Sequence, residues 1–316
     1  MISITPLKGS KVKGLSCFRA LGCVHPHPIL ADSVRLFYTP YPPEEEELPY
    51  LATSEDGVTF ETKCGPLIGR GSWDSHHLAD VDVLFDGNRW LMYYAGASID
   101  GKKRVSIGVA SGDGFCKWEK VGLALSHGRI ATTPSVIRTD HFYMYYATLE
   151  GGVQTLWVAL SEDGISFKPV SRVLSPFSEW NSHGLNHPHA SILGDFIILL
   201  FLGYDNRCFS LGYALFNVNS PDKPIFVSRK PLLTNRGRLT CRWSHSRITS
   251  ITRRIYRRWI HALVPWNSLH FYRSAFLTTP DRRVVVEDGR AVMYVSAYDA
   301  LFKVPSIGVY EVLVDG

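Results

Sequence analysis

The chain has 316 residues, of which 45% are hydrophobic and 20% charged, a balance typical of a globular protein with a sizeable core. Its longest apolar run, residues 196–202, is too short to cross a bilayer, so no membrane partner is expected. The net charge of +5 is mild, and the arginines crowded into residues 236–258 accompany no nucleic-acid-binding motif. We therefore expect no nucleic-acid partner either.

The cysteines and the amino-terminal residues indicate the cellular compartment in which the protein is expected. The six cysteines, at positions 17, 23, 64, 116, 208 and 241, form no CxxC pair and no dense framework. Residues 1–14 contain no apolar stretch long enough for the core of a signal peptide. The sequence thus predicts a cytoplasmic protein with free thiols, with a Cys17–Cys23 cross-link as the less favoured alternative.

A short phrase recurs along the chain: Ser-x-Asp-Gly or a near copy, followed by an aromatic residue. It stands at Ser54–Phe60, Ser111–Trp118 and Ser161–Phe167, with weaker relatives at Asn217–Phe226 and Thr278–Val285. Each copy follows aromatic-rich strand material. A strand-rich unit repeated every roughly 40–55 residues is typical of a β-propeller.

The second repeat shows the unit most fully. Four strands are predicted, at Val81–Phe85, Trp90–Ala95, Val105–Ala110 and around Trp118–Val121, with an Asp-Gly-Asn turn at residues 86–88. Strands such as WLMYYA are apolar on both faces, as a sheet between two neighbouring sheets requires. The repeat therefore predicts a four-stranded antiparallel blade.

The innermost strands set the number of blades. They are expected to begin at His27, Asp80, Thr133, His189 and about Ser246, at near-equal intervals of 53, 53, 56 and 57 residues. This spacing predicts an all-β, five-bladed β-propeller formed by one domain, residues 1–316. Residues 290–297 and 306–312 resemble a further hairpin, which we expect to complete the last blade with residues 2–20 and close the ring. A sixth blade is the alternative.

The two faces of such a propeller differ in composition. The Asp-Gly turns share one face, where their aspartates are expected to bond local backbone. The loops on the other face, the pocket face, are rich in His and Trp. They span residues 25–28, 73–80, 126–134, 178–189 and 241–247. Aromatic rings beside polar groups suit a carbohydrate, so a sugar, oligosaccharide or glycoconjugate is the expected partner.

Two segments carry a family resemblance: ADVDVLFDGNRWLMYYAG, residues 79–96, and RVSIGVASGDGFCKW, residues 104–118. They resemble the five-bladed propeller glycoside hydrolases of families 43, 32, 62, 68 and 130, and the resemblance extends over residues 25 to about 312. It implies an acidic residue at the start of several inner strands, which Asp80 matches. The chain departs from this pattern at His27, Thr133 and His189, so the usual pair of carboxylates is not visible.

Glycoside cleavage needs a proton donor and a second group that activates water or attacks the sugar. We expect Asp80 to be the base or to modulate a partner, and Glu150 and Asp205, in loops between second and third strands, to be candidate acids. The run Glu44–Glu47 is expected to be a solvated loop tip. The candidate substrate-binding residues are His27, Trp73, His76, His77, Asp82, Thr133, Trp180, Asn186, His187, His189, His245, Arg247 and Trp266.

The leading interpretation is thus a glycoside hydrolase-like enzyme, with a phosphorylase or transglycosidase variant included, that requires no cofactor. The arginines at 236, 238, 242 and 247 favour an anionic sugar. One alternative is a sugar-binding propeller without catalysis. Another is a metal-dependent enzyme, in which a central divalent cation would be held by His27, His189 and His245.

Overall fold

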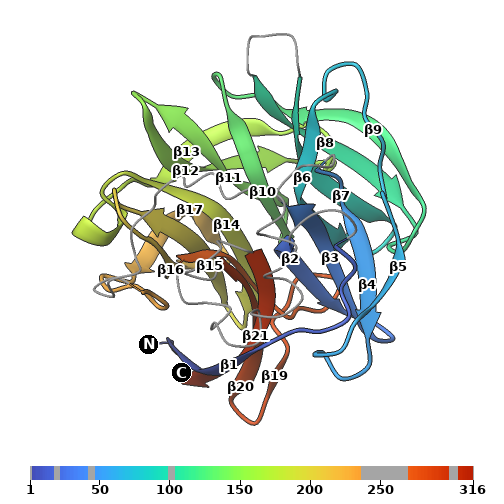
Figure 1. Ribbon diagram of the computed structural model, residues 1–316. Coiled ribbons are helices and arrows are strands. Elements are labelled where there is room, and N and C mark those ends of the chain that lie inside the picture. Colours follow the sequence, from blue (N-terminus) through green and yellow to red (C-terminus); the bar gives the residue numbers. More distant parts are fainter. Residues whose placement is uncertain are drawn as a thin grey trace.

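The computed structural model describes residues 2–17, 22–41, 47–98, 104–235, 270–298 and 305–315. These residues form antiparallel sheets arranged around a common axis (Figure 1). Among the described residues the sheets are five blades of four principal strands each, which confirms the predicted five-bladed β-propeller. No helix in this part of the chain has the length and apolarity needed to span a membrane.

The first four blades follow one another along the chain. Blade 1 contains β2 (Gly22–Leu30), β3 (Val34–Tyr41), β4 (Tyr50–Ser54) and β5 (Glu61–Cys64). Blade 2 contains β6 (His77–Phe85), β7 (Trp90–Ala97), β8 (Val105–Gly112) and β9 (Trp118–Leu125). Blade 3 contains β10 (Ala131–Arg138), β11 (Phe142–Glu150), β12 (Val153–Ser161) and β13 (Lys168–Leu174). Blade 4 follows the one-turn η1 (Glu179–Asn181) and contains β14 (Gly184–Leu193), β15 (Phe196–Tyr204), β16 (Phe209–Asn217) and β17 (Ser220–Val227).

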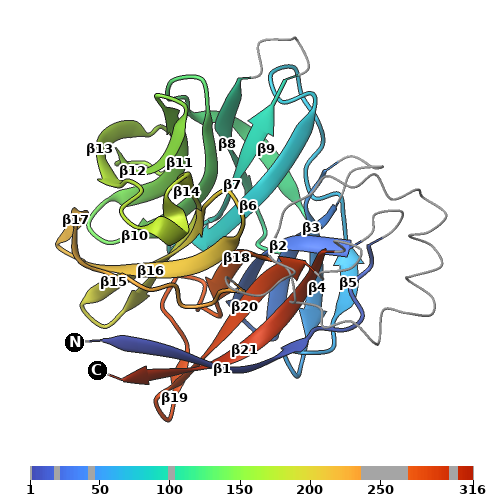
Figure 2. The same ribbon diagram turned by 60° about the vertical axis from the view of Figure 1, so that its left-hand side comes forward.

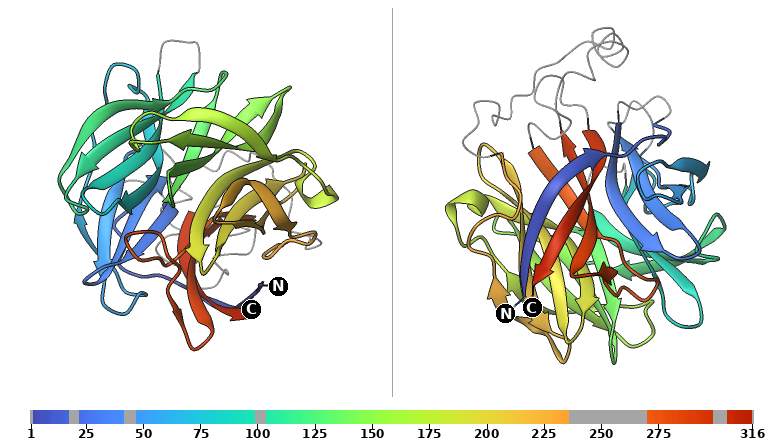
Figure 3. Two further views of the ribbon diagram at one scale, coloured as in Figure 1. Left: turned by 180° about the vertical axis from the view of Figure 1, so that it is seen from behind. Right: turned by 90° about the horizontal axis from the view of Figure 1, so that it is seen from below.

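Blade 5 joins the two ends of the chain. Its strands, from the axis outward, are β18 (His270–Phe276), β20 (Arg290–Tyr298), β21 (Pro305–Asp315) and β1 (Ser3–Lys11), with the short β19 (Val286–Glu287) also on β20. β1 pairs with β21 from Ser3 opposite Asp315 to Lys11 opposite Gly308, and the termini lie together (Figures 2 and 3). The predicted ring closure is confirmed. The predicted fifth inner strand near Ser246 is wrong, because β18 is the innermost strand; residue 246 itself lies outside the described residues.

The Asp-Gly turns have the structural role predicted for them. Asp56 Oδ1 accepts the N–H groups of Val58 and Thr59 at 2.8 and 2.6 Å and the Ser54 hydroxyl at 2.9 Å. Asp163 makes the same contacts in blade 3: its Oδ1 accepts the Ser161 hydroxyl and the N–H groups of Ile165 and Ser166. These carboxylates therefore stabilise turns rather than bind a ligand.

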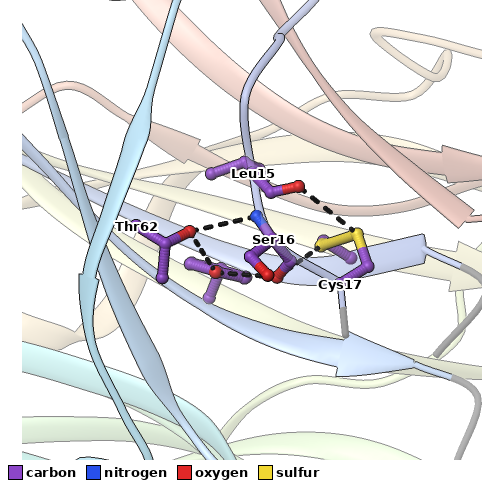
Figure 4. Close-up of a disulfide and its surroundings, with 6 residues drawn as sticks. Leu15, Ser16, Cys17 and Thr62 are labelled. Atoms are coloured by element: carbon purple, nitrogen blue, oxygen red, sulfur yellow. Dashed lines mark hydrogen bonds between the residues drawn. A yellow bond between two sulfur atoms is a disulfide. The ribbon is translucent and has the colours of Figure 1, made fainter. Parts of the chain in front are cut away.

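Disulfides contradict the expectation of free thiols. Cys64 at the end of β5 is bonded to Cys116 in the β8–β9 turn, which links blades 1 and 2. Cys17 is bonded to Cys23 at the start of β2, and the neighbouring Ser16 N–H donates to Thr62 Oγ1 at 3.0 Å (Figure 4). Sequence spacing could not reveal the Cys64–Cys116 bond, because it depends on how two blades sit side by side.

Candidate functional site

The innermost strands of blades 1 to 4 share one backbone irregularity on the pocket face. Each contains a residue with positive φ: His25 at 56°, Asp80 at 56°, Thr133 at 53° and His187 at 45°. The register of each strand with its partner shifts at this point. Residues other than glycine seldom adopt this conformation, and they concentrate at functional sites. The bulges direct equivalent residues of four blades toward the axis.

The bulge residues of blades 1, 2 and 4 form a first cluster, made of His25, Asp80 and His187. Oδ1 of Asp80 lies 3.2 Å from His25 Nε2 and 3.3 Å from His187 Nδ1. Arg273 of β18 places Nη1 at 3.4 Å from the same oxygen and donates from Nη2 to the Val81 carbonyl at 3.2 Å. The ring of Tyr272, next to it, lies 4.5 Å from the His187 ring. All five blades but the third thus contribute to this cluster.

Two residues further along the same strands, His27, Asp82 and His189 form a second cluster. Its side chains are completely buried. Arg282, which comes from the turn after β18, places Nη1 at 3.1 Å from Asp82 Oδ1 and donates from Nη2 to Ser135 Oγ at 3.0 Å. A guanidinium group thus fills the middle of the second cluster and joins the inner strands of several blades.

The charged neighbours determine the protonation of both aspartates. Burial alone would raise the pKa of Asp80, but His25, His187 and Arg273 outweigh it and hold that pKa well below its usual range. Burial likewise opposes ionisation of Asp82, and Arg282 with His27 lowers its pKa nevertheless. Both carboxylates are therefore ionised at neutral pH.

The pKa of Glu47 is shifted in the opposite direction, upward. Its loop joins β3 to β4 and reaches blade 2, where the Leu78 N–H donates to the Glu47 carbonyl at 3.0 Å. Burial, and then the negative charge of Asp80, raise the pKa of the Glu47 side chain to about 7. The prediction of a solvated loop tip is wrong for this residue, which is half-buried beside the first cluster. Residues 44–46 lie outside the described residues.

The expected acids are engaged elsewhere. Glu150 lies 3.3 Å from Arg172 and accepts from Thr155 at 2.9 Å; although its partial burial opposes ionisation, these contacts lower its pKa. Asp205 accepts the N–H groups of residues 207 and 208, both at 2.7 Å, within its own turn. Neither arrangement supports the role of proton donor.

The predicted substrate-binding residues divide into four groups: beside the first cluster, on blade 2, buried in the core or second cluster, and outside the described residues. Thr133 and Asn186 lie beside the first cluster, because Thr133 donates to Asn186 Oδ1 at 3.0 Å and that oxygen also accepts the His187 N–H. Trp73 on blade 2 is half-buried and lines a hollow of about 520 Å³. The backbone N–H of His76 donates to the Ala97 carbonyl.

Four further predictions are corrected by burial. Trp180 stacks on Phe201 within the core, at a centroid distance of 5.9 Å, and is not available to a ligand. His27, Asp82 and His189 are fully enclosed in the second cluster, out of reach of a substrate. His245, Arg247, Trp266 and the arginines at 236, 238 and 242 lie outside the described residues, as does the side chain of His77.

Sequence reasoning missed several residues of the site. Arg273 and Arg282 reach the axis from segments that are about 190 and 200 residues beyond Asp80 and Asp82 along the chain. Tyr272 belonged to an unremarkable segment, and Glu47 to a run of glutamates that was expected to be solvated. His25 had a signal that could have found it, because HPH at residues 25–27 and 187–189 matches the spacing of Asp80-Val81-Asp82.

Comparisons with known proteins agree with this architecture. No family model matches the chain. A curated relative, a 1,2-β-oligomannan phosphorylase of Thermoanaerobacter sp. (strain X514), is 21% identical over 186 residues, which are 58% of this chain and 62% of the relative. The aligned part thus spans less than two thirds of that protein's length.

Solved structures match over most of the chain. A glycosyl hydrolase from Bacteroides ovatus superposes with a TM-score of 0.64 at 16% identity, covering 92% of this chain and 83% of that one. The β-1,2-mannobiose phosphorylase of Listeria innocua, in complex with β-1,2-mannobiose, gives a TM-score of 0.64 at 13% identity, covering 92% and 89%. The chain therefore shares the propeller fold of these glycoside hydrolases and phosphorylases.

Proposed function

We propose that the chain is an enzyme that cleaves or transfers a glycosidic linkage, with Glu47 as the proton donor and Asp80 as the ionised carboxylate opposite it. The proposal rests on the opposite effects that the surroundings of the two carboxyl groups have on their pKa values. The environment of Glu47 raises its pKa to about 7, whereas the pKa of Asp80 is held far lower. Two carboxyl groups whose surroundings separate their pKa values in this way are typical of acid–base pairs in glycosidases.

The chemistry assigns a task to each group. Glu47 keeps its proton up to about pH 7 and can deliver it to the departing glycosidic oxygen. Asp80 stays negative and can activate the acceptor or stabilise positive charge at the anomeric carbon. His25, His187 and Arg273 maintain that negative charge.

The acceptor distinguishes a hydrolase from a phosphorylase. The curated relative and one structural match are phosphorylases, and the other structural match is a hydrolase. Arg273, the cation beside Asp80, is completely buried and engaged with that carboxylate and the Val81 carbonyl, so the comparison of turnover with and without phosphate decides the acceptor. The substrate we propose is accordingly a sugar, oligosaccharide or glycoconjugate, with β-1,2-mannobiose as the first compound to test.

Chromogenic glycosides with leaving groups of different acidity test the assignment, with and without phosphate. Asp80→Asn should lose turnover of every substrate by about 100-fold or more. Glu47→Gln should lose far less with an acidic phenol, which departs without a proton, than with a sugar leaving group. The matched control is Glu162→Gln, an exposed glutamate on the opposite face, which should keep wild-type turnover. Equal losses for all leaving groups in Glu47→Gln would remove its role.

The same assays separate the alternative of a non-catalytic sugar-binding propeller, which would bind β-1,2-mannobiose and release no product from any glycoside. We further propose that residues 1–316 form one domain, without nucleic-acid or membrane partners. The cytoplasmic location stays a prediction. The disulfides Cys17–Cys23 and Cys64–Cys116 weigh against it, because such bonds form mainly in oxidising compartments.

A further inference from the structure

The first cluster has the composition of a metal site. It offers one carboxylate oxygen and two imidazole nitrogens from three different blades, and these atoms lie within 4.8 Å of one another. A set of two histidines and one carboxylate that leaves other positions open is a recurrent ligand arrangement for zinc and iron. Only 4% of His25, 7% of Asp80 and 4% of His187 is exposed, so the ligands are held in place by the surrounding strands.

The spacing within the cluster fits a metal better than a direct ion pair. Charge-assisted hydrogen bonds between nitrogen and oxygen are about 2.7–2.9 Å long. The His25–Asp80 and His187–Asp80 separations are 3.2 and 3.3 Å. Ligand atoms bound at about 2.0–2.2 Å to a tetrahedral zinc ion lie about 3.3–3.6 Å from one another. The two separations from Asp80 are thus close to those between ligands of one metal ion, and the ligand atoms of all three residues lie within 4.8 Å of one another.

The backbone gives an independent reason to regard the arrangement as functional. All three residues have φ between 45° and 56°, a conformation that is unfavourable for histidine and aspartate. Each such residue costs of order 1–3 kcal/mol, and the fold maintains it at equivalent positions of four blades, with Thr133 in the third. This strain is what brings the three ligand atoms to one point on the axis.

The second cluster shows why only the first is assigned a metal. It contains the same residue types at the same spacing, but the Arg282 guanidinium lies 3.1 Å from Asp82 Oδ1 and 3.1 Å from His27 Nδ1. In addition, the Val83 N–H donates to His27 Nε2 at 3.0 Å, which occupies that nitrogen. Arg282 thus takes the place of a metal ion there by contacting both the aspartate and a histidine. In the first cluster Arg273 lies 3.4 Å from Asp80 Oδ1, and its second contact is with the Val81 carbonyl.

We propose that His25, Asp80 and His187 bind a divalent transition-metal ion, with zinc as the ion of choice. This site goes beyond the proposed glycosidic chemistry and shares Asp80 with it. With an ion bound, Asp80 would be a ligand rather than a free base, so the two proposals give Asp80 different roles and are tested separately. Water or an anionic group completes the coordination.

Metal titration of the chelator-treated protein tests the site. Zinc sulfate added in a calorimeter should bind at one ion per chain, and cobalt(II) should give visible absorption characteristic of nitrogen and oxygen ligands. His187→Gln should weaken zinc binding by at least about 100-fold. Asp80→Asn, which preserves the size of the side chain, gives the same test should His187→Gln fail to fold in a thermal unfolding measurement.

The control is His141→Ala, which removes another histidine beside a carboxylate. His141 lies on the surface, 2.9 Å from Asp140, and its loss should leave the zinc affinity unchanged. Two results would overturn the proposal: no stoichiometric binding of zinc to the wild-type protein, or undiminished binding in both His187→Gln and Asp80→Asn. Because neither measurement uses a glycoside, failure here leaves the proposed glycosidic activity to be judged by its own assays.

Discussion

Replacement of Arg282 by Met should destabilise the propeller strongly. The guanidinium is completely buried and lies 3.1 Å from Asp82 Oδ1, so its removal leaves a buried carboxylate without its main counter-charge. Loss of one partner of a buried ion pair costs about 3–5 kcal/mol. The hydrogen bonds to Ser135 Oγ and to the Ala190 carbonyl disappear as well, each contributing about 1 kcal/mol. Since these contributions overlap, we expect a loss of about 5 kcal/mol.

That loss is large against a typical unfolding free energy of about 5–15 kcal/mol. Urea unfolding followed by tryptophan fluorescence measures it. The matched control is Arg283→Met, the adjacent residue, whose guanidinium pairs with Asp281 at 3.1 Å on the surface. Such an exposed pair contributes about 0–1 kcal/mol, so this variant should be nearly as stable as the wild type.

A double variant, Arg282→Met with Asp82→Asn, tests whether the unpaired charge of Asp82 causes the loss of stability. Removing the carboxylate charge as well should recover at least about 1 kcal/mol relative to the sum of the two single losses.

The contribution of Asp82 to stability should also depend on pH, with a definite sign. Because Arg282 and His27 lower the pKa of Asp82 despite its burial, its stabilisation is present above the unfolded pKa of about 3.9 and is lost as the pH falls through the folded value. Additive single losses, or a loss below about 1 kcal/mol in Arg282→Met, would refute the reasoning.

Three further predictions concern other parts of the molecule. Turnover should fall as the pH rises through about 7, where Glu47 loses its proton, and Glu47→Gln should lack this limb with an acidic leaving group; an unchanged limb would assign it to another residue. Asp163→Ala should lower the unfolding free energy in urea by about 1 kcal/mol, since its turn loses three hydrogen bonds, and an unchanged midpoint would contradict this. Reduction of Cys64–Cys116, which are 52 residues apart, should cost about 4 kcal/mol, and equal melting temperatures of Cys64→Ser and the oxidised protein would be inconsistent with it.

Local repeats made most of the fold predictable. The Asp-Gly turns and two-sided apolar strands depend on nearby residues, so the strands of blade 2 were located to within a few positions at most ends. The fifth inner strand was not, because equal spacing assumes loops of equal length, and loop length changes without altering a blade. The β1–β21 pairing was found from the need to close the ring, not from a pattern within either strand.

The site was less predictable than the fold. The first and second clusters take residues two positions apart on the same strands, and the sequence around the two positions is alike. Sequence reasoning grouped His27 with Asp80 and His189, whereas the bulges place His25 and His187 beside Asp80. The bulge adds residues to one strand only. Nothing in HPH or DVD alone shows which of the two polar residues belongs to the first cluster and which to the second. Glu47 was missed for a different reason: a run of glutamates ordinarily indicates solvent, and its burial depends on the neighbouring blade.

The proposed mechanism requires that Glu47 is protonated and Asp80 is ionised at the same pH. Carbon-13 NMR of the side-chain carboxyl groups, assigned with Glu47→Gln and Asp80→Asn, measures both titrations in the folded protein. We predict that Glu47 titrates near pH 7 and that Asp80 remains ionised down to well below pH 3.9. Titration of both groups near pH 4 would contradict the assignment of acid and base, and with it the proposed cleavage of glycosidic bonds at this site.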